Sequence, residues 1–405
     1  MAALRPVSKP LRSLAQPISC HRHRRTLSSS SPLPKLSWLD LRGTGLSAAE
    51  RLAIEEVLLR HDPLQRCWGI VGIHEPTSNR YLNFPLPPYS TGVGGEGGAR
   101  DWNAQRKLAQ RREADVYGHE NTGANRSCAI ILGIGGKPEK LINLPAAQQD
   151  GVLVLKRFSG GGTVVVDHDS LWTTFIGRNK VMKEVKPFPR EIMQWSADVI
   201  FAPAFEKWNE QIVSSDETFG AATRKLLVAP KKRGRQTLVF QGKSCGFSGG
   251  FGESLVLPPE LSLNESNTDF QNCPLPRFQL RENDYVLGER KMGGNAQSIV
   301  KDGWLHHTSF LWDYDAHNMQ YLTLPDKRPD YRGDRPHDEF LVKLKDHYDG
   351  RSTKHEFFGH VKSSASESFE LEEVTTGEVL GLMNEKFGGL QGWFDGKCRT
   401  KPMRV

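Results

Sequence analysis

A helical pattern of apolar residues opens the ordered part of the chain. Within residues 44–62, Ser47 and Glu50 have the spacing of a capping box, in which each side chain bonds the other residue's backbone N–H. We predict an amphipathic helix here, with Glu55 and Glu56 on its outer side. Its apolar face comprises Leu52, Ile54, Val57 and Leu58.

Short runs of apolar or β-branched residues, separated by turn residues, predict strands along the rest of the chain. These strands and the intervening helices follow no regular βαβ order. We therefore expect an α+β fold with a mixed, mostly antiparallel sheet and flanking helices. The predicted strands are 67–72, 128–133, 151–157, 162–167, 171–176, 284–288, 295–301, 304–312 and 367–373. Further helices are predicted at 190–208, 316–322, 337–348 and 375–387.

Two polar, glycine-rich stretches interrupt this pattern. Residues 74–126 hold five glycines between positions 92 and 98, and they predict a loop insertion with one helix at 101–117. Residues 209–276 predict a second loop insertion. The chain thus divides into a leader (1–37), a main domain (38–350) and a small C-terminal tail with a strand and a helix (351–405).

The distribution of charge indicates where the protein goes. The chain has 54 Lys plus Arg and 47 Asp plus Glu, which gives a formal net charge of +7. Seven of the basic residues and no acidic residue lie in the first 39 positions, so the body is neutral. An Arg- and Ser-rich leader without acid or a long apolar run is typical of an organellar transit peptide. We predict import into the mitochondrion, with the plastid as the alternative.

A neutral body disfavours binding to polyanions. The basic run at 231–235 is the strongest candidate for contact with nucleic acid, but no RNA-binding fingerprint accompanies it. The chain contains no run of about 18 apolar residues, so no membrane span is predicted. We therefore expect no nucleic acid partner, no membrane and a monomer. The six cysteines form no Cys-x-x-Cys pair, so they predict ordinary thiols rather than a zinc or redox site.

The most distinctive run is 156–167, which reads Lys-Arg-Phe-Ser-Gly-Gly-Gly-Thr-Val-Val-Val-Asp. Three glycines without Cβ atoms let a ligand approach the backbone and let consecutive N–H groups point at an anion. Arg157 adds a planar cation that suits phosphate or carboxylate. The run is neither a Walker loop nor a dinucleotide fingerprint. It is also compatible with a plain glycine-rich hairpin.

Two later runs contain polar residues that are candidates for the functional site. Residues 289–298 place Lys291 before two glycines, where an ammonium can stabilise charge that develops during adenylation. A solvated lysine in a surface turn also fits this run. Residues 303–312 contain His306 and His307. Neighbouring residues of a strand face opposite sides, so we predict one histidine near the site and no metal ligand pair.

Together these runs resemble the motifs of the lipoate–protein ligase family, within the biotin/lipoate ligase fold class. Their order is Arg-x-Ser-Gly-Gly-Gly, then Arg-Lys-x-x-Gly-x-Ala, then His-His-x-Ser-x-Leu. The resemblance covers about 39–72, 127–206 and 278–348, and neither insertion has a counterpart in it. It implies an enzyme that activates lipoate or octanoate to acyl-AMP with ATP and Mg²⁺. The acyl group then passes to a lysine of a carrier domain.

The resemblance also implies a role for each matching residue. Lys291 would be the essential catalytic lysine, bridging the acyl carbonyl and the phosphate. Arg157 would contact the nucleotide phosphate and the acyl carboxylate, while Asn295 and Ala296 would line the acyl-adenylate pocket. The binding positions of the first motif, with the glycines and the next three residues as the floor of the pocket, would be Ser159, Gly160, Gly161, Gly162, Thr163, Val164, Val165 and Asp167.

Some positions depart from the family's pattern and leave the acyl specificity open. Lys156 stands where an arginine is usual, Val166 where a histidine is usual, and Ser170 where an asparagine is expected. The alternative is therefore a non-catalytic or acyltransferase-type protein that binds acyl-adenylate or an acyl carrier. No cysteine lies beside the motifs, which disfavours a cysteine acyl-enzyme, and the absence of a Gly-Arg-Gly-Arg-x-Gly loop disfavours biotin. The implied partners are lipoyl carrier domains of 2-oxoacid dehydrogenase complexes or the glycine cleavage H protein.

Overall fold

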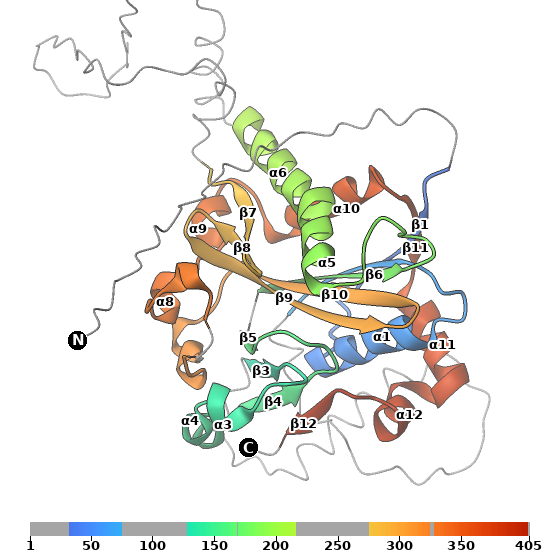
Figure 1. Ribbon diagram of the computed structural model, residues 1–405, viewed down its shortest axis with the longest axis horizontal. Coiled ribbons are helices and arrows are strands. Elements are labelled where there is room, and N and C mark those ends of the chain that lie inside the picture. The colour runs from blue at the N-terminus through green and yellow to red at the C-terminus, as the bar shows by residue number, and fades with distance from the viewer. Residues whose placement is uncertain (1–31, 75–127, 168, 216–274, 325–327, 404–405) are drawn as a thin grey trace, which may run out of the picture. The chain divides into compact units, whose positions relative to one another are not determined.

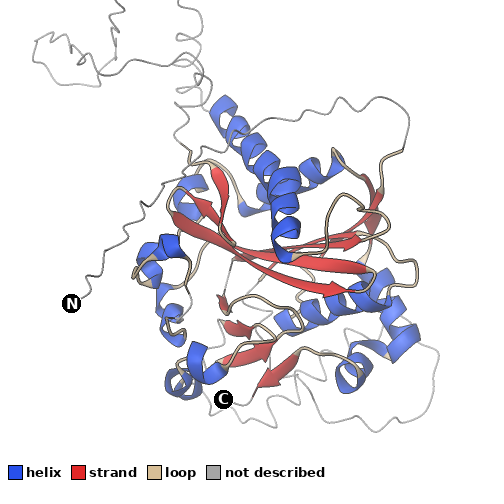
Figure 2. Ribbon diagram, in the orientation of Figure 1, coloured by secondary structure: helices blue, strands red, loops and turns tan. Residues whose placement is uncertain are grey.

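Two β-sheets form the framework of the protein (Figures 1 and 2). The computed structural model describes residues 32–74, 128–167, 169–215, 275–324 and 328–403. From Pro34 onward the chain forms one unit. The predicted C-terminal tail is therefore part of the main domain.

The large sheet has the strand order β11-β1-β2-β6-β10-β9-β8-β7. β1 pairs in parallel with β11 and with β2, and the other neighbouring pairs are antiparallel. The α+β class with a mixed, mostly antiparallel sheet is confirmed. The strands are β1 (Lys35–Asp40), β2 (Trp68–Ile73), β6 (Ser170–Arg178), β7 (Phe278–Arg281), β8 (Asp284–Leu287), β9 (Arg290–Val300), β10 (Gly303–Leu311) and β11 (Glu370–Val374).

The small sheet has the strand order β12-β4-β3-β5. Its strands are β3 (Ala129–Leu132), β4 (Leu153–Lys156), β5 (Val164–Val166) and β12 (Lys401–Met403). β4 and β5 each pair with β3, in parallel and antiparallel respectively, and not with each other. The segment 157–163, which we call the glycine loop, therefore crosses from one side of β3 to the other. The glycine-rich hairpin that the sequence also allowed is not formed.

Helices cover one face of the large sheet (Figure 1). They are α5 (Pro189–Trp195), a π-helical turn (Ser196–Phe201), α6 (Ala202–Ser215) and α10 (Lys354–Ser366). Aromatic residues such as Phe201, Trp208 and Phe310 pack between these helices and the sheet. The predicted helix at 190–208 thus continues to Ser215, which takes seven residues from the second predicted insertion. Most of both insertions, including the predicted helix at 101–117, lies outside the described residues.

Helix α1 (Ala48–His61) lies between the large sheet and the small sheet (Figure 1). The predicted capping box of Ser47 and Glu50 is confirmed, and the same device begins α10 and a later helix, α11. The prediction that Glu55 and Glu56 face solvent is wrong, because their exposed fractions are 2% and 0%. Since the helix is covered on several sides, its polar residues are buried along with its apolar ones.

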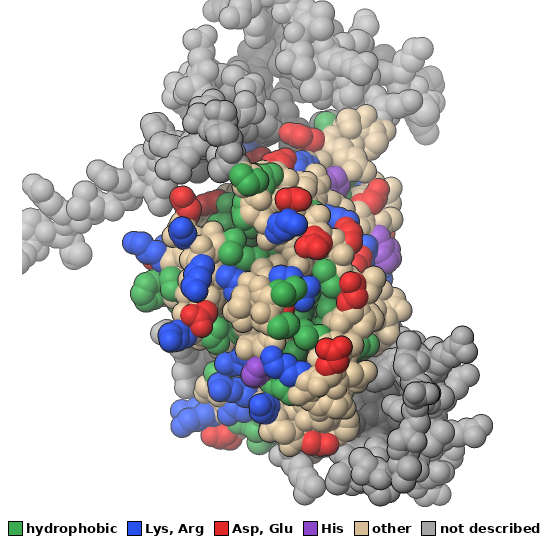
Figure 3. Space-filling view, turned by 90° about the vertical axis from the view of Figure 1, so that its right-hand side faces the viewer, with side chains coloured by type: hydrophobic (Ala, Val, Ile, Leu, Met, Phe, Trp, Pro, Cys, Tyr) green, Lys and Arg blue, Asp and Glu red, His purple; other side chains and the backbone are tan. Residues whose placement is uncertain are grey.

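The C-terminal region completes both sheets through β11 and β12. It also contributes α11 (Thr376–Phe387) and α12 (Gly389–Gly396), which pack against α1 through Met383 and Trp393. Lys and Arg side chains gather in the lower part of the face shown in Figure 3. The predicted helix at 337–348 is instead two short helices, α8 (His337–Phe340) and α9 (Lys345–Tyr348). The remaining short helices are α3 (Pro138–Leu141), α4 (Leu144–Gln149), and 3₁₀ turns at Ala316–Tyr321 and Asp330–Arg332.

Strand β1 begins before residue 38, where the sequence predicts the start of the main domain. Because β1 starts at Lys35, residues 35–37 of the predicted leader pair with β11 in the large sheet. Leu36 is 1% exposed, so this end of the strand belongs to the core. Among the described residues, no helix has the length and apolar character needed to cross a membrane.

Candidate active site

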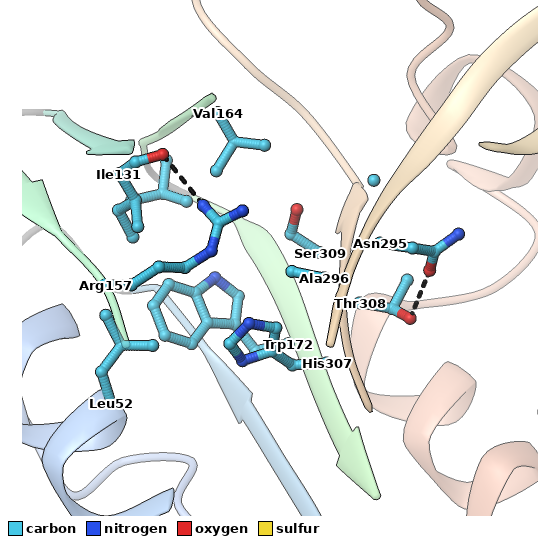
Figure 4. A pocket seen from close by; sticks show the side chains of 12 residues that line it. Leu52, Ile131, Arg157, Val164, Trp172, Asn295, Ala296, His307, Thr308 and Ser309 are labelled. Carbon is cyan, nitrogen blue, oxygen red and sulfur yellow. Dashed lines mark hydrogen bonds between the residues drawn. The ribbon is translucent and has the colours of Figure 1, made fainter. Parts of the chain in front are cut away.

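A pocket lies between the two sheets, with α1 at one side (Figure 4). It encloses about 410 Å³ of space, part of it open to solvent. One part of its wall is apolar and the other carries hydrogen-bonding groups, a combination that suits an amphipathic small molecule. The wall comprises Leu52, Ile131, Arg157, Val164, Val166, Trp172, Gly294, Asn295, Ala296, His307, Thr308 and Ser309.

The glycine loop borders this pocket and depends on the absence of a side chain at Gly161. The backbone there has φ +94°, and a Cβ atom would lie 2.8 Å from the Asn295 carbonyl oxygen. Gly160 N–H donates to the Gln297 carbonyl at 2.8 Å, which ties the loop to β9. No described residue accepts from the N–H groups of Gly161 and Gly162, and both residues are exposed. These two donors can therefore receive an anion.

Arg157 holds the loop from inside. Its guanidinium donates to the carbonyls of Gly160 (2.8 Å), Gly162 (2.7 Å) and Ile131 (3.1 Å), and its Nε donates to Ser159 Oγ at 3.0 Å. Burial lowers its pKa to about 10, so it remains a cation at neutral pH. Because the loop carbonyls turn inward to Arg157, the residue organises the loop and places a positive charge in the pocket wall.

Strand β9 supplies Asn295 and Ala296 to the pocket, where the sequence predicted them. Lys291 lies on the same strand, next to an irregularity that leaves Met292 unpaired with β8. Its Nζ is 2.7 Å from Asp284 Oδ1, and Tyr331 donates to the other oxygen of Asp284 at 2.9 Å. A Cβ atom at Gly294 would lie 3.6 Å from this Nζ. The ammonium is thus beside the Gly294 corner of the pocket and paired with Asp284.

A chain of hydrogen bonds runs beneath the pocket through His307. Its Nε2 lies 2.7 Å from Ser159 Oγ, and its Nδ1 lies 2.9 Å from Glu55 Oε2. Thr174 donates to the other oxygen of Glu55 at 2.6 Å. Sequence reasoning placed Ser159 and a histidine at the site but missed Glu55 and Thr174. No sequence signal marks them, because only the tertiary fold brings α1 and β6 to the loop.

His306 confirms the prediction that the two histidines face opposite sides. It is fully buried on the other face of β10, where Gln297 Nε2 lies 2.9 Å from its Nδ1 and the Tyr285 hydroxyl lies 3.2 Å from its Nε2. Burial and the neighbouring His307 lower its pKa to about 3, so the ring is neutral at physiological pH. In the described ranges, no three His, Cys, Asp or Glu side chains come together to hold a metal ion.

Several predicted binding residues lie away from the pocket wall. Val165 packs in the core beneath β3, since alternate residues of β5 face opposite sides and only Val164 and Val166 reach the pocket. Asp167 is buried and accepts from the Asp315 backbone N–H and from Asn318, which makes it an anchor for the chain after β10. Ser159 lies beneath the wall, and Thr163 is half-buried outside it. These positions correct the predicted floor of the pocket.

The described cysteines, Cys67, Cys128 and Cys398, are all buried free thiols, and none lines the pocket. Burial raises the pKa of Cys128 and Cys398 to about 12, so both stay protonated. A thiol without access or thiolate character is a poor nucleophile. These three cysteines are structural.

Comparison with known proteins gives one curated relative with partial coverage. The chain is 25% identical over 240 residues to "Inactive lipoate--protein ligase 2" of Plasmodium falciparum (isolate 3D7), which covers 56% of this chain and 50% of that protein. The chain therefore spans about half the length of the curated relative that it matches.

The solved structures that match the chain do so at low sequence identity. A lipoate-protein ligase A bound with ATP has 15% identity and a TM-score of 0.40, covering 90% of this chain and 95% of that chain. An archaeal bi-partite lipoate protein ligase from Thermoplasma acidophilum has 15% identity and a TM-score of 0.41, covering 91% and 94%. P. falciparum LipL1 in complex with lipoate has 13% identity and a TM-score of 0.42, covering 89% and 72%.

A family model, the lipoyl protein ligase A/B catalytic domain, matches residues 99–214 and 261–365. The first matched range begins inside the first predicted insertion, and neither range includes residues 39–72. The family model therefore covers a different set of residues from the resemblance that the sequence motifs indicated. The two matched ranges contain all three motifs and together make up more than half of the chain. The chain belongs to the lipoyl protein ligase A/B catalytic domain family.

Proposed function

We propose that the protein is an ATP-dependent lipoate–protein ligase. It would activate lipoate or octanoate to acyl-AMP and transfer the acyl group to a lysine of a carrier domain. The observation that carries this proposal is the junction of two kinds of wall in one pocket. An apolar part formed by Leu52, Ile131 and Val164 meets a part that holds the Arg157 guanidinium and the polar side chains of Asn295 and Thr308. An acyl chain fits the first part and a phosphate the second.

In the activation step, an oxygen of the acyl carboxylate attacks the α-phosphorus of ATP and pyrophosphate leaves. Negative charge grows around that phosphorus, so fixed positive groups lower the barrier more than a nucleophilic side chain would. The N–H groups of Gly161 and Gly162 would bind a phosphate oxygen, while Arg157 contributes its charge from behind the loop. Lys291 would turn from Asp284 towards the acyl phosphate at the Gly294 corner.

In the transfer step, the amine of the target lysine attacks the acyl carbonyl and AMP leaves. The bond from the carbonyl carbon to the phosphate oxygen breaks as the new C–N bond forms. Lys291 and Asn295 would orient the acyl-adenylate for this attack. Mg²⁺ stays a proposal as the partner of ATP.

The acceptor and the compartment are also proposals. We infer a lipoyl domain of a 2-oxoacid dehydrogenase complex, or the glycine cleavage H protein, as the carrier. The acid-free, Arg-rich leader supports import into the mitochondrion, with the plastid as the alternative. We also propose that the protein is a monomer.

A second candidate function is binding of acyl-adenylate without turnover. The observation that favours it is the ion pair between Lys291 and Asp284, which neutralises the ammonium that catalysis needs. The replaced motif positions Lys156, Val166 and Ser170 point the same way. This reading predicts tight binding of acyl-AMP with no release of pyrophosphate.

ATP–pyrophosphate exchange separates the two candidates. The full chain, with lipoate and ATP, should exchange labelled pyrophosphate, and octanoate should replace lipoate whereas biotin should not. Lys291→Ala should lower the exchange rate at least about a hundredfold, because it removes a positive group from the developing charge. Lys301→Ala, at an exposed turn, is the matched control and should exchange like the parent. No exchange with any of these acids would contradict the ligase.

A further inference from the structure

A cluster of cations lies on the surface behind the glycine loop. It comprises Arg60, Lys156, Lys386, Lys397, Arg399 and Lys401, which we call the basic face. Figure 3 shows Lys and Arg side chains gathered around a histidine in the lower part of this side of the molecule. Their closeness also acts on His61, whose pKa is lowered by burial and by Lys386, Lys397 and Arg60.

Most of these charges have no exposed acidic partner among the described residues. Lys386 and Lys401 each donate to a backbone carbonyl, of His61 and Phe394, at 3.0 Å. Lys397 lies over the Phe387 ring, 5.7 Å from its centroid. Arg60 and Arg399 share one buried carboxylate, Glu56, at 3.1 Å and 3.9 Å. The face therefore keeps an excess of positive charge in a protein whose body is neutral.

The basic face reaches the wall of the pocket through one layer of side chains. Lys156 directly precedes Arg157, and it stands opposite Lys401 in the pairing of β4 with β12. The Arg60 guanidinium lies over the Phe158 ring, 6.0 Å from its centroid. The Phe158 ring in turn packs edge-on against His307, at 6.2 Å between centroids. A partner seated on this face would thus lie next to the glycine loop.

The C-terminal region builds most of this face. Lys386, Lys397, Arg399 and Lys401 belong to residues 376–403, whereas the match to the family model ends at residue 365. The same segment carries the exposed acids Glu378, Glu385 and Asp395. Mixed charge of this kind suits a protein surface with a matching pattern, while a nucleic acid backbone would be repelled by these acids.

We propose that the basic face is the docking surface for an acidic folded domain that presents its target lysine to the pocket. This inference rests on the proposed function, because it names the partner class of the transfer step. Charge pairing across such a surface raises the rate of encounter and sets orientation, and salt weakens it. The adenylation step involves no protein partner and is independent of the face.

Charge reversal on the full chain tests this proposal. The double variant Lys386→Glu with Lys397→Glu should raise the KM for an apo lipoyl domain about tenfold, since two attractive charges become repulsive. Its pyrophosphate exchange with lipoate should stay at the parent value. Raising the ionic strength should lower kcat/KM for the carrier in the parent and much less in the variant. The matched control is Lys183→Glu with Lys186→Glu, two exposed lysines outside the basic face, which should behave like the parent.

A binding measurement keeps this inference separate from the proposed function. The parent should bind a poly-glutamate peptide at low ionic strength, and the Lys386→Glu, Lys397→Glu variant should lose that binding while the control keeps it. This result stands even if the parent fails to exchange pyrophosphate, an outcome that would contradict only the ligase. Equal peptide binding by both double variants would overturn the docking surface. Tighter binding of a duplex oligonucleotide than of the peptide, at equal salt, would also overturn it.

Discussion

His307 Nε2 lies 2.7 Å from Ser159 Oγ, and this contact joins the large sheet to the glycine loop. Behind it, His307 Nδ1 faces Glu55 Oε2 at 2.9 Å. The buried carboxylate of Glu55 therefore orients the His307 ring. The opposite edge of this ring holds the glycine loop, which borders the pocket. The geometry of the glycine loop is thus set by three segments that are far apart in the chain.

Removing the Ser159 hydroxyl tests this connection. In Ser159→Ala, the Nε of Arg157 loses its acceptor on Ser159 and the Nε2 of His307 loses its partner, so we expect the free energy of unfolding to fall by about 1–3 kcal/mol. Urea unfolding followed by circular dichroism measures the change. Ser214→Ala, at an exposed position of α6, is the control and should change it by less than about 0.5 kcal/mol. Equal losses in the two variants would argue against the connection.

Two neighbouring glycines of the loop should respond differently to the same substitution. In Gly161→Ala, the new Cβ would lie 2.8 Å from the Asn295 carbonyl oxygen, on a backbone with φ +94°. In Gly162→Ala, the new Cβ would have no neighbour within 4 Å among the described residues. We expect Gly161→Ala to lower pyrophosphate exchange at least about tenfold, because it displaces the N–H groups that bind phosphate. Gly162→Ala should change it little, and similar losses in both variants would contradict this account of the loop.

The buried neutral His306 predicts a loss of stability in acid. Its pKa is lowered in the folded protein from 6.5 to about 3, so between these values the unfolded chain binds one more proton than the folded one. The free energy of unfolding should therefore decrease as the pH is lowered through this window, by about 1.4 kcal/mol per pH unit from this residue alone. His306→Gln should flatten that slope in urea unfolding measured from pH 6.5 to 4. His317→Gln, an exposed histidine, should keep it, and an unchanged slope in both variants would remove His306 as the cause.

The partner of Lys291 should control how the ammonium acts. In Asp284→Asn, Lys291 loses its ion pair, so the pocket becomes more positive and the ammonium less fixed. We expect acyl-AMP to bind more tightly, by about fivefold, and kcat for adenylation to rise, because Lys291 no longer has to leave Asp284 to reach the acyl phosphate. Isothermal titration and pyrophosphate exchange measure the two effects. A fall in kcat would contradict this movement of Lys291 and would instead identify Asp284 as a group that positions the ammonium.

Local patterns in the sequence predicted much of the fold. The capping box of Ser47 and Glu50, the opposed faces of His306 and His307, and the placement of Asn295 and Ala296 all follow from periodicity, spacing or motif. The sequence failed where tertiary contact decides. Glu55 reads as an outer residue of an amphipathic helix, yet it is buried against the large sheet, where it contacts Thr174 of β6 and His307 of β10.

The route of the glycine loop shows the same limit. A strand, three glycines and a strand read locally as a hairpin, but β3, which comes earlier in the chain, lies between β4 and β5. This pairing turns Val165 and Asp167 away from the pocket, and it lets Arg157 bond the loop carbonyls. The C-terminal tail was likewise predicted as a small separate region with one strand, because the sequence does not show that β11 and β12 pair with strands from elsewhere in the chain.

The most direct test is the intact mass of an apo lipoyl domain after incubation with the full chain, ATP and lipoate. We predict that the carrier gains the mass of one lipoyl group at a single lysine. The gain should be lost in Lys291→Ala and kept in Lys301→Ala. An unchanged carrier mass with the parent protein, or full modification by Lys291→Ala, would contradict the assignment of ligase activity to this pocket.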